Sequence, residues 1–308
     1  MGAAAPQVHQ GRAREVRAAR RLRLAGSDPG RLRHSRRSRA SGVTGATRTE
    51  DGAVLTRRSS RRIDALQEVA DGVFFSRGRG SNWVLLRDGR ELTLIDAGYP
   101  ADAAQVAGDV RSLAGGIAGL RAVLLTHGHI DHVGALPGLL RHRAVPVHAH
   151  PAEIPHLHGE VHDQAGPLDV LRNLTLPHMP SWLAMVLRSG GTTPVHLTGA
   201  TALPTTGMLD LPGAPEPVLV AGHTRGHAAY LLREPGVLVT GDALVTGHPL
   251  SRLHGPQMLP EFFAHDPQQA LEQLEVLTTL PAELILPGHG PAWRGSPRAA
   301  VEIVRQRS

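Results

Sequence analysis

Four side chains that can bind metal ions lie close together in the sequence. They are His127, His129, Asp131 and His132, in the pattern HxHxDH. Burying four such groups is costly without a partner, and a divalent cation can satisfy all of them. Neutral imidazole and carboxylate groups suit zinc, manganese and iron. A loop can turn the first two histidines one way and the last two residues the other, so the pattern predicts two adjacent metal ions.

The sequence contains no cysteine. The chain therefore has no disulfide, no thiolate ligand and no cysteine nucleophile, and any metal must be bound by histidine, aspartate or glutamate. No segment approaches the run of about 20 apolar residues that a membrane-spanning helix needs. We therefore expect a soluble, cytoplasmic protein without a membrane partner.

Short apolar runs separated by glycine and proline predict the frame that positions this loop. A buried strand over 122–125 runs directly into the loop, and a short helix over 135–142 follows it. Residues 87–90 provide a hairpin turn. The other predicted strands are 73–75, 83–86, 92–95, 217–220, 229–232, 237–240 and 284–286, and the other predicted helices are 101–114, 267–280 and 296–306.

Two segments differ from this frame. Residues 1–62 hold 16 arginines and 4 acidic residues and lack apolar periodicity, which predicts a disordered tail before one domain at 63–308. The tail is interpreted as an extension without function or a mis-assigned start, as a targeting segment, or as an arm for a polyanion. Residues 151–205 are broken by prolines such as Pro155 and Pro167, which predicts an inserted cap over the site.

The HxHxDH run after a buried strand resembles the signature of the metallo-β-lactamase superfamily. Three further segments resemble that family's motifs in the same order, and the resemblance covers nearly all of 63–308. It implies an α/β fold, a four-layer αββα sandwich of two mixed β-sheets. The three segments are Gly-His-Thr-Arg-Gly-His at 222–227, Thr-Gly-Asp at 240–242 and Pro-Gly-His-Gly at 287–290.

The same resemblance implies a ligand set for two Zn²⁺ ions per chain, with iron or manganese as the other candidate metals. One ion would be held by His127, His129 and His223, and the other by Asp131, His132 and His289. Asp242 would bridge them. Ligating groups need oriented neighbours, and we expect Asp96 and His227 to supply them without binding metal themselves.

The remaining histidines have no matching partners in the sequence. We expect most of them, including His156, His158 and His162, to lie on the surface. His248 and His254 follow Asp242 closely enough to line the site.

The implied activity is hydrolysis of a small ester, thioester or lactone. Two divalent ions that share a water lower its pKa towards neutrality, so a metal-bridging hydroxide would attack the carbonyl carbon. Asp131 is the candidate to orient that group or to move a proton. The β-lactamases with a cysteine ligand are excluded, and only 19 residues follow His289, which leaves little room for the helical glutathione-binding domain of glyoxalase II. Among such hydrolases, the quorum-signal lactonases place a tyrosine shortly after the bridging aspartate, whereas Ala243 follows Asp242 here, which weakens the lactonase assignment.

Two other functions compete with this hydrolase. A mononuclear iron oxygenase similar to the persulfide dioxygenases shares HxHxDH. A non-enzymatic binding module or a nucleic-acid processing enzyme is less favoured, because residues 63–308 carry 17 arginines against 23 acidic residues. The expected partner is a small-molecule substrate, and the oligomeric state stays open.

Overall fold

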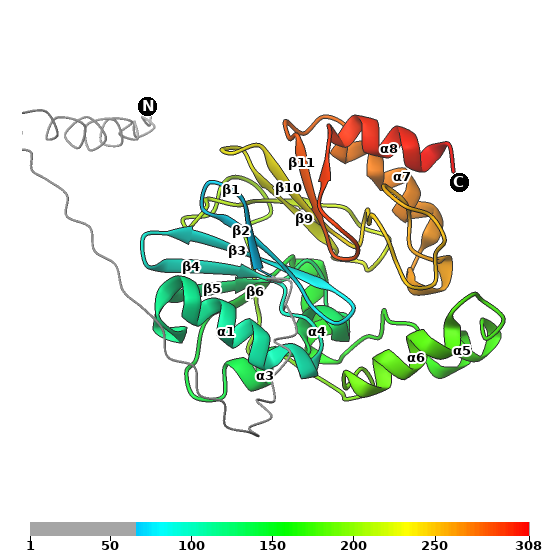
Figure 1. Cartoon of the computed structure of the whole chain (residues 1–308), viewed down its shortest axis with the longest axis horizontal. Coiled ribbons are helices and arrows are strands. Elements are labelled where there is room, and N and C mark those ends of the chain that lie inside the picture. The colour runs from blue at the N-terminus through cyan, green and yellow to red at the C-terminus, as the bar shows by residue number, and fades with distance from the viewer. Residues whose placement is uncertain (1–65, 308) are drawn as a thin grey trace, which may run out of the picture. The chain divides into compact units, whose positions relative to one another are not determined.

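The computed structural model describes residues 66–307. In this range the chain forms two mixed β-sheets that pack face to face, with helices on the outer face of each sheet (Figure 1). The predicted disordered tail, residues 1–62, lies outside the described residues. Within residues 66–307, no helix is both long enough and apolar enough to cross a bilayer.

The first sheet has seven strands in sequence order. They are β1 (Leu66–Ala70), β2 (Val73–Arg77), β3 (Asn82–Asp88), β4 (Glu91–Ile95), β5 (Leu120–Leu124), β6 (Val147–Ala149) and β7 (Thr201–Ala202). Strands β1 to β4 pair antiparallel, and β4 to β7 pair parallel. Asp88 pairs with Glu91 across the predicted hairpin turn.

The second sheet has five strands. They are β8 (Glu216–Leu219), β9 (Ala228–Leu232), β10 (Val237–Gly241), β11 (Leu284–Pro287) and β12 (Trp293–Arg294), in the spatial order β12-β11-β10-β9-β8. Only β10 and β11 are parallel. This pairing brings the carboxyl ends of β10 and β11 to the same edge of the sheet.

Eight α-helices and four 3₁₀ helices lie within residues 66–307. The α-helices are α1 (Ala103–Ala114), α2 (Ile130–Val133), α3 (Leu136–Leu139), α4 (Ile154–His158), α5 (Pro167–Arg172), α6 (Met179–Arg188), α7 (Pro267–Leu277) and α8 (Pro297–Arg305). The 3₁₀ helices are η1 (Pro100–Asp102), η2 (Ile117–Gly119), η3 (Pro151–Glu153) and η4 (Glu261–Phe263).

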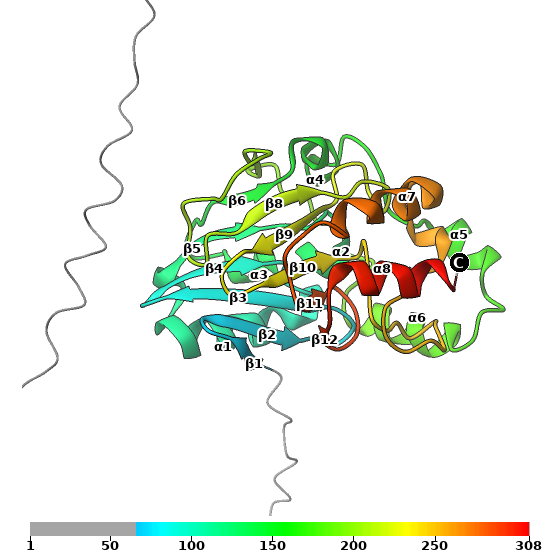
Figure 2. The same cartoon turned by 90° about the horizontal axis from the view of Figure 1, so that it is seen from above.

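Successive side chains of a buried strand point to opposite faces of its sheet, which explains how one strand contributes to two layers of the sandwich. In β3, Trp83 and Leu85 pack in a core shared with α1 and α3, whereas Val84 and Leu86 pack between the two sheets. A third core lies between the second sheet and helices α7 and α8, which cover that sheet in Figure 2. Because both faces of such strands are buried, they read as continuous apolar runs in the sequence. The predicted αββα sandwich of two mixed sheets is confirmed.

The four predicted helices are all longer than the observed α-helices, and the difference is largest for two of them. The helix predicted at 135–142 is reduced to α3, because residues 141–144 are all exposed and offer no apolar face to pack. The helix predicted at 267–280 ends at Leu277, and Pro281 follows closely. The strand before the ligand loop is two residues longer at its start than predicted, since β5 begins at Leu120.

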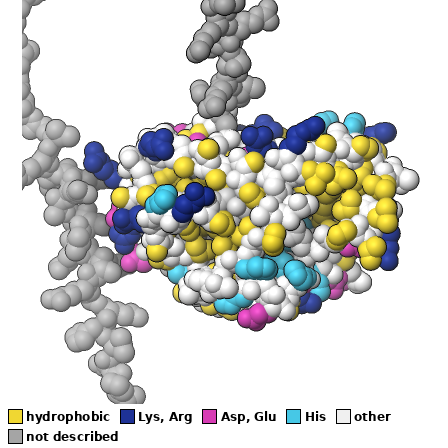
Figure 3. Space-filling model, turned by 90° about the horizontal axis from the view of Figure 1, so that it is seen from below, with side chains coloured by type: hydrophobic (Ala, Val, Ile, Leu, Met, Phe, Trp, Pro, Cys, Tyr) yellow, Lys and Arg dark blue, Asp and Glu magenta, His cyan; other side chains and the backbone are white. Residues whose placement is uncertain are grey.

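Helices α4, α5 and α6 occupy the segment predicted as a cap. Figure 1 shows α5 and α6 projecting beyond the two sheets. Leu168 and Leu171 of α5, Leu187 of α6 and Leu174 between these helices are exposed. Figure 3 shows apolar side chains gathered on the face of the molecule that is seen from below. That residues 151–205 are an insertion remains a prediction.

Candidate metal centre

The polar cluster of the molecule lies where strands of both sheets end. It receives side chains from the loop after β5, from α2, and from the loops that follow β8, β10 and β11. Strand ends at one edge of a sheet are close in space, although they are far apart in sequence. The structure therefore brings together all seven predicted ligands: His127, His129, Asp131, His132, His223, Asp242 and His289.

The first set of three consists of His127, His129 and His223. Each presents a ring nitrogen, and these nitrogens all lie within 4.8 Å of one another. His223 Nε2 is 3.0 Å from His129 Nδ1. All three side chains are buried, at 5% exposure or less.

The second set consists of Asp131, His132 and His289, whose ligand atoms also lie within 4.8 Å of one another. Asp242 lies between the two sets. Its Oδ2 is 3.1 Å from His289 Nε2 and 3.4 Å from His223 Nε2, and its Oδ1 is 3.4 Å from His132 Nε2. One carboxylate can therefore reach two neighbouring ions.

Backbone carbonyls orient two of the histidines. His129 Nε2 donates to the carbonyl oxygen of Asp163 at 2.7 Å, which turns its Nδ1 towards the cluster. His289 Nδ1 donates to the carbonyl oxygen of Gly80 at 2.6 Å, which turns its Nε2 the same way. Such hydrogen bonds select the tautomer of a ligating imidazole.

Asp96 forms hydrogen bonds to the loop after β5 that carries His127 and His129, and to His132 of α2. Its carboxylate accepts hydrogen bonds from Thr126 N at 2.8 Å, Thr126 Oγ1 at 2.7 Å and His132 Nδ1 at 2.8 Å. Thr126 Oγ1 in turn accepts from His127 Nδ1 at 2.9 Å. Asp96 adopts a left-handed backbone conformation with φ 59°, which aspartate tolerates better than most residues. That Asp96 orients the metal ligands remains a prediction.

His227 contacts the backbone of Asp242, and its ring centroid is 5.0 Å from that of His127. Its Nε2 accepts the backbone N–H of Asp242 at 3.0 Å. Burial lowers the pKa of His227 to about 3, so the ring stays neutral and remains an acceptor. That His227 orients the metal ligands remains a prediction.

The charges of the cluster suit cations. Burial alone would lower the pKa of His289, but Asp242 and Asp131 raise it to about 10. Three ligand atoms are buried without a hydrogen-bond partner among the described residues: His127 Nε2, His132 Nε2 and Asp242 Oδ1. Buried lone pairs without donors are costly, and a divalent ion would satisfy them. The donor set contains only nitrogen and oxygen, as zinc, manganese and iron accept.

A family model described as the metallo-beta-lactamase superfamily matches residues 76–289. The chain belongs to the metallo-beta-lactamase superfamily. It is similar to "Probable metallo-hydrolase YflN" of Bacillus subtilis (strain 168), with 32% identity over 211 residues that cover 64% of this chain and 74% of the relative. The predicted family is confirmed, and the protein is a metallo-hydrolase.

Two further comparisons extend over more of the chain. "Thioesterase pkgB" of Emericella nidulans is 26% identical over 268 residues, which cover 83% of this chain and 62% of the relative. The metallo-beta-lactamase family protein TTHA1429 from Thermus thermophilus superimposes with a TM-score of 0.54 and 22% identity. That match covers 78% of this chain and 80% of the other, and it shows the fold alone.

Glu153 is a buried residue of this superfamily member that the sequence did not reveal. Its Oε1 accepts the N–H of Gly128 at 2.8 Å, and its Oε2 accepts Thr224 Oγ1 at 2.7 Å and the N–H of Gly226 at 3.0 Å. One carboxylate thus ties the HxHxDH loop to the loop that carries His223. No local pattern marks Glu153, because its partners come from two distant segments.

Replacing Glu153 by glutamine is expected to remove a pH dependence of stability. Burial raises the pKa of Glu153 from 4.5 to about 7, although its three donors lower it. The contribution of Glu153 to the free energy of unfolding is therefore complete below about pH 4.5 and is lost as the pH rises through about 7. The difference in unfolding free energy between wild type and Glu153→Gln should shrink by about 3 kcal/mol over this range.

Denaturant titrations at several pH values measure this difference. The variant Thr224→Val removes one donor and keeps the carboxyl group, so it should lose stability and retain the pH dependence. If wild type and Glu153→Gln differ in unfolding free energy by the same amount at pH 4.5 and at pH 8, Glu153 does not titrate in this range.

His156 is not a surface residue, which corrects the sequence prediction. It is 8% exposed, its Nδ1 accepts the N–H of Asp163 at 3.1 Å, and its ring centroid is 5.9 Å from that of His129. The absence of a side chain at Gly128 makes room for it, since a Cβ there would lie 2.3 Å from His156 Cδ2. His162 is exposed, as predicted, whereas His158 is half-buried.

Only one of the two histidines after Asp242 lies near the site. The ring centroid of His248 is 5.2 Å from that of His289, and His248 lines the adjacent cavity. His254 is exposed, so its prediction was wrong. The chain turns away at Gly255, which has φ +80°.

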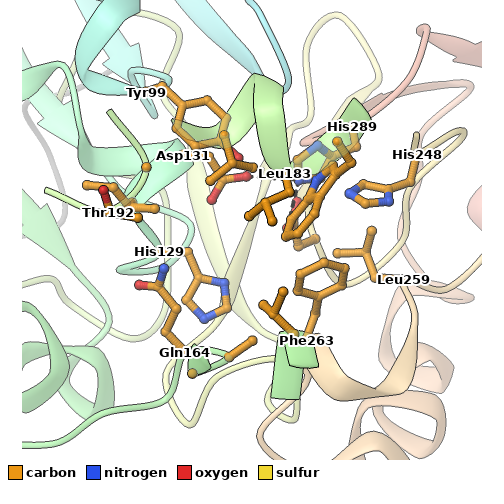
Figure 4. Close-up of a pocket in the computed structure, with 18 of the residues that line it drawn as sticks. Tyr99, His129, Asp131, Gln164, Leu183, Thr192, His248, Leu259, Phe263 and His289 are labelled. Carbon is orange, nitrogen blue, oxygen red and sulfur yellow. Dashed lines mark hydrogen bonds and ion pairs between the residues drawn. The ribbon is translucent and has the colours of Figure 1, made fainter. Parts of the chain in front are cut away.

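Tyr99 is a second residue that the sequence did not predict. Ala243 and not a tyrosine follows Asp242, but Tyr99 reaches the same cavity from the loop after β4 (Figure 4). A Cβ at Gly80 would lie 3.0 Å from its ring, and a Cβ at Gly191 would lie 3.1 Å from it. The backbone at both glycines therefore packs closely against the ring. Burial and the charge of Asp131 raise the pKa of Tyr99, which keeps the phenol protonated.

Proposed function

We propose that this metallo-hydrolase holds two zinc ions and cleaves a small ester, thioester or lactone. The observation that carries the proposal is the position of Asp242, within 3.4 Å of ring nitrogens from both sets of three. A single-ion site would not need a buried carboxylate between two complete ligand sets. Manganese or iron could bind the same donors.

Each set would hold one ion. His127, His129 and His223 would bind the first, and Asp131, His132 and His289 the second. When bound, the two ions would supply a shared water of lowered pKa and a Lewis acid for the carbonyl oxygen. The name of the thioesterase relative supports a carbonyl substrate.

Asp131 is the proposed residue for orienting the nucleophile or moving a proton. Its Oδ2 is 3.3 Å from His289 Nε2, and its side chain is 15% exposed, whereas the other proposed ligands are at most 5% exposed. It also lines the cavity. Asp131 can therefore contact both the ions and a bound substrate. A small-molecule substrate, a cytoplasmic location and the lack of a nucleic-acid partner remain predictions.

Metal analysis of the purified protein tests the proposal first. We expect two zinc ions per chain, hydrolysis of at least one member of a panel of aryl esters, thioesters and lactones, and loss of activity after chelation. Activity should return when zinc is restored. A single iron per chain, with oxygen consumption on a persulfide, would instead support the oxygenase alternative and contradict the hydrolase.

Replacing Asp96 by asparagine is expected to weaken metal binding by roughly tenfold to a hundredfold. Asparagine tolerates the left-handed backbone, but one arm of its amide cannot accept hydrogen bonds. It would therefore lose a contact to Thr126 or to His132. Competition with a chromophoric chelator measures the affinity.

The matched control is Asp109→Asn. Asp109 is also a buried aspartate; it lies on α1, and its Oδ2 accepts hydrogen bonds from Ser76 Oγ and Trp83 Nε1. This variant should lower stability and leave zinc affinity unchanged. Equal zinc affinity in wild type and Asp96→Asn would remove Asp96 from the proposed metal centre.

A further inference from the structure

A cavity of about 510 Å³ opens beside the proposed metal centre. His129, Asp131, His223, Asp242 and His289 form one end of it. Figure 4 shows side chains from several distant segments converging on this space. The volume lies within the range of cavities that hold a small organic ligand.

The wall away from the metal centre is apolar. It is built mostly by α5, α6 and the loop around η4, with Ile130 as a neighbour of the ligands. Its apolar side chains are those of Ile130, Pro167, Val170, Trp182, Leu183, Val186, Leu259 and Phe263.

Two aromatic residues make part of this wall rigid. The rings of Trp182 and Phe263 are 5.5 Å apart and inclined at 64°, and His248 packs 5.4 Å from Phe263. Trp182 is 8% exposed and belongs to a cluster with Tyr99 and Met179. The apolar end of the cavity is therefore formed before any ligand binds.

Among the described residues, no arginine lines this cavity, and its apolar part, away from the histidines of the proposed metal centre, has no cationic side chain. Asp131 and Asp242 are the carboxylates that line it. Arg225, on the loop that carries His223, pairs instead with Asp163. An anionic group in the apolar part would lose its hydration without gaining a partner.

We propose that the substrate is uncharged at its acyl end and carries an apolar acyl chain or aryl group that packs along Trp182, Leu183 and Phe263. The inference rests on the proposed hydrolase function and names the substrate class of that site. The carbonyl group would lie at the end formed by Asp131 and Asp242, and the chain would extend towards α6.

A series of aryl esters from acetate to octanoate tests this with zinc-loaded protein. Because each buried methylene favours binding, kcat/KM should rise by roughly fourfold per methylene until the cavity is full. An ester of the same length that ends in a carboxylate should be cleaved roughly a hundredfold less efficiently.

The variant Leu183→Arg places a cation in the apolar wall. It should raise kcat/KM for the carboxylate-ended ester relative to the neutral ester of equal length. Leu187→Arg is the matched control, because Leu187 lies one turn further along α6, is 54% exposed and does not line the cavity. This control should keep the wild-type preference.

The outcomes separate the two proposals. Equal kcat/KM from acetate to octanoate, or a wild-type preference for the carboxylate-ended ester, would overturn the substrate class and leave the hydrolase function standing. If protein with two zinc ions cleaves no ester, thioester or lactone, the proposed function itself is wrong, and the substrate class falls with it.

Discussion

Asp242→Asn is expected to lower kcat/KM by about a thousandfold, since a catalytic metal contributes several kcal/mol to the transition state. The substitution keeps the shape of the side chain and removes its negative charge. Asp242 lies between His132, His223 and His289, and no other carboxylate among the described residues contacts both ligand sets. The metal content of the purified variant should therefore fall from two ions per chain to about one.

Metal analysis and kinetics on the same preparation measure this effect. The variant should remain folded, because the fold depends on three apolar cores that Asp242 does not enter. Circular dichroism checks this point. Two tightly bound zinc ions and wild-type kcat/KM in Asp242→Asn would contradict a bridging role for Asp242.

Gly288→Ala is expected to reduce activity by about a hundredfold or more, the effect of moving a catalytic group by about an ångström. A Cβ at this position would lie 2.1 Å from Asp242 Oδ1 and 2.8 Å from His132 Cε1. Both atoms belong to side chains with little freedom to move, since Asp242 and His132 are buried. The methyl group must therefore displace the carboxylate of Asp242, the proposed bridging ligand.

The matched control is Gly108→Ala in α1. A Cβ there meets nothing within 4 Å, and alanine favours a helix over glycine by about 0.5–1 kcal/mol. This variant should gain stability and keep wild-type activity. Gly288→Ala should be compared with it for kcat/KM and zinc content, and equal values in both variants would show that the centre tolerates a side chain at 288.

The residues of the proposed metal centre were predictable because their chemistry is local and unusual. Histidines and aspartates directly after buried strands have few structural explanations, and each of the four motifs ends a strand that apolar patterning also identifies. The parallel pairing of β4 with β5 and of β10 with β11 then brings those strand ends together. The positions of the strands were predicted for the same reason, since runs buried on both faces are apolar throughout.

Distance along the chain was a poor guide to the remaining residues. His254 is nearer to Asp242 in sequence than His289 is, yet a turn at Gly255 leaves it exposed. His156 has no neighbour in the sequence at a metal-ligand spacing. The absence of a side chain at Gly128 leaves room for it, and it is buried beside His129.

The sequence by itself determined the family, the sandwich of two mixed sheets and the seven side chains that converge on one centre. Only the tertiary structure decided which groups hold and surround them. Glu153 joins two ligand loops, Asp163 orients His129 through its carbonyl oxygen, and α6 supplies an apolar wall without a cation. The physical reason is that ligand chemistry belongs to individual residues, whereas burial, hydrogen-bond partners and cavity shape arise from segments that meet only after folding.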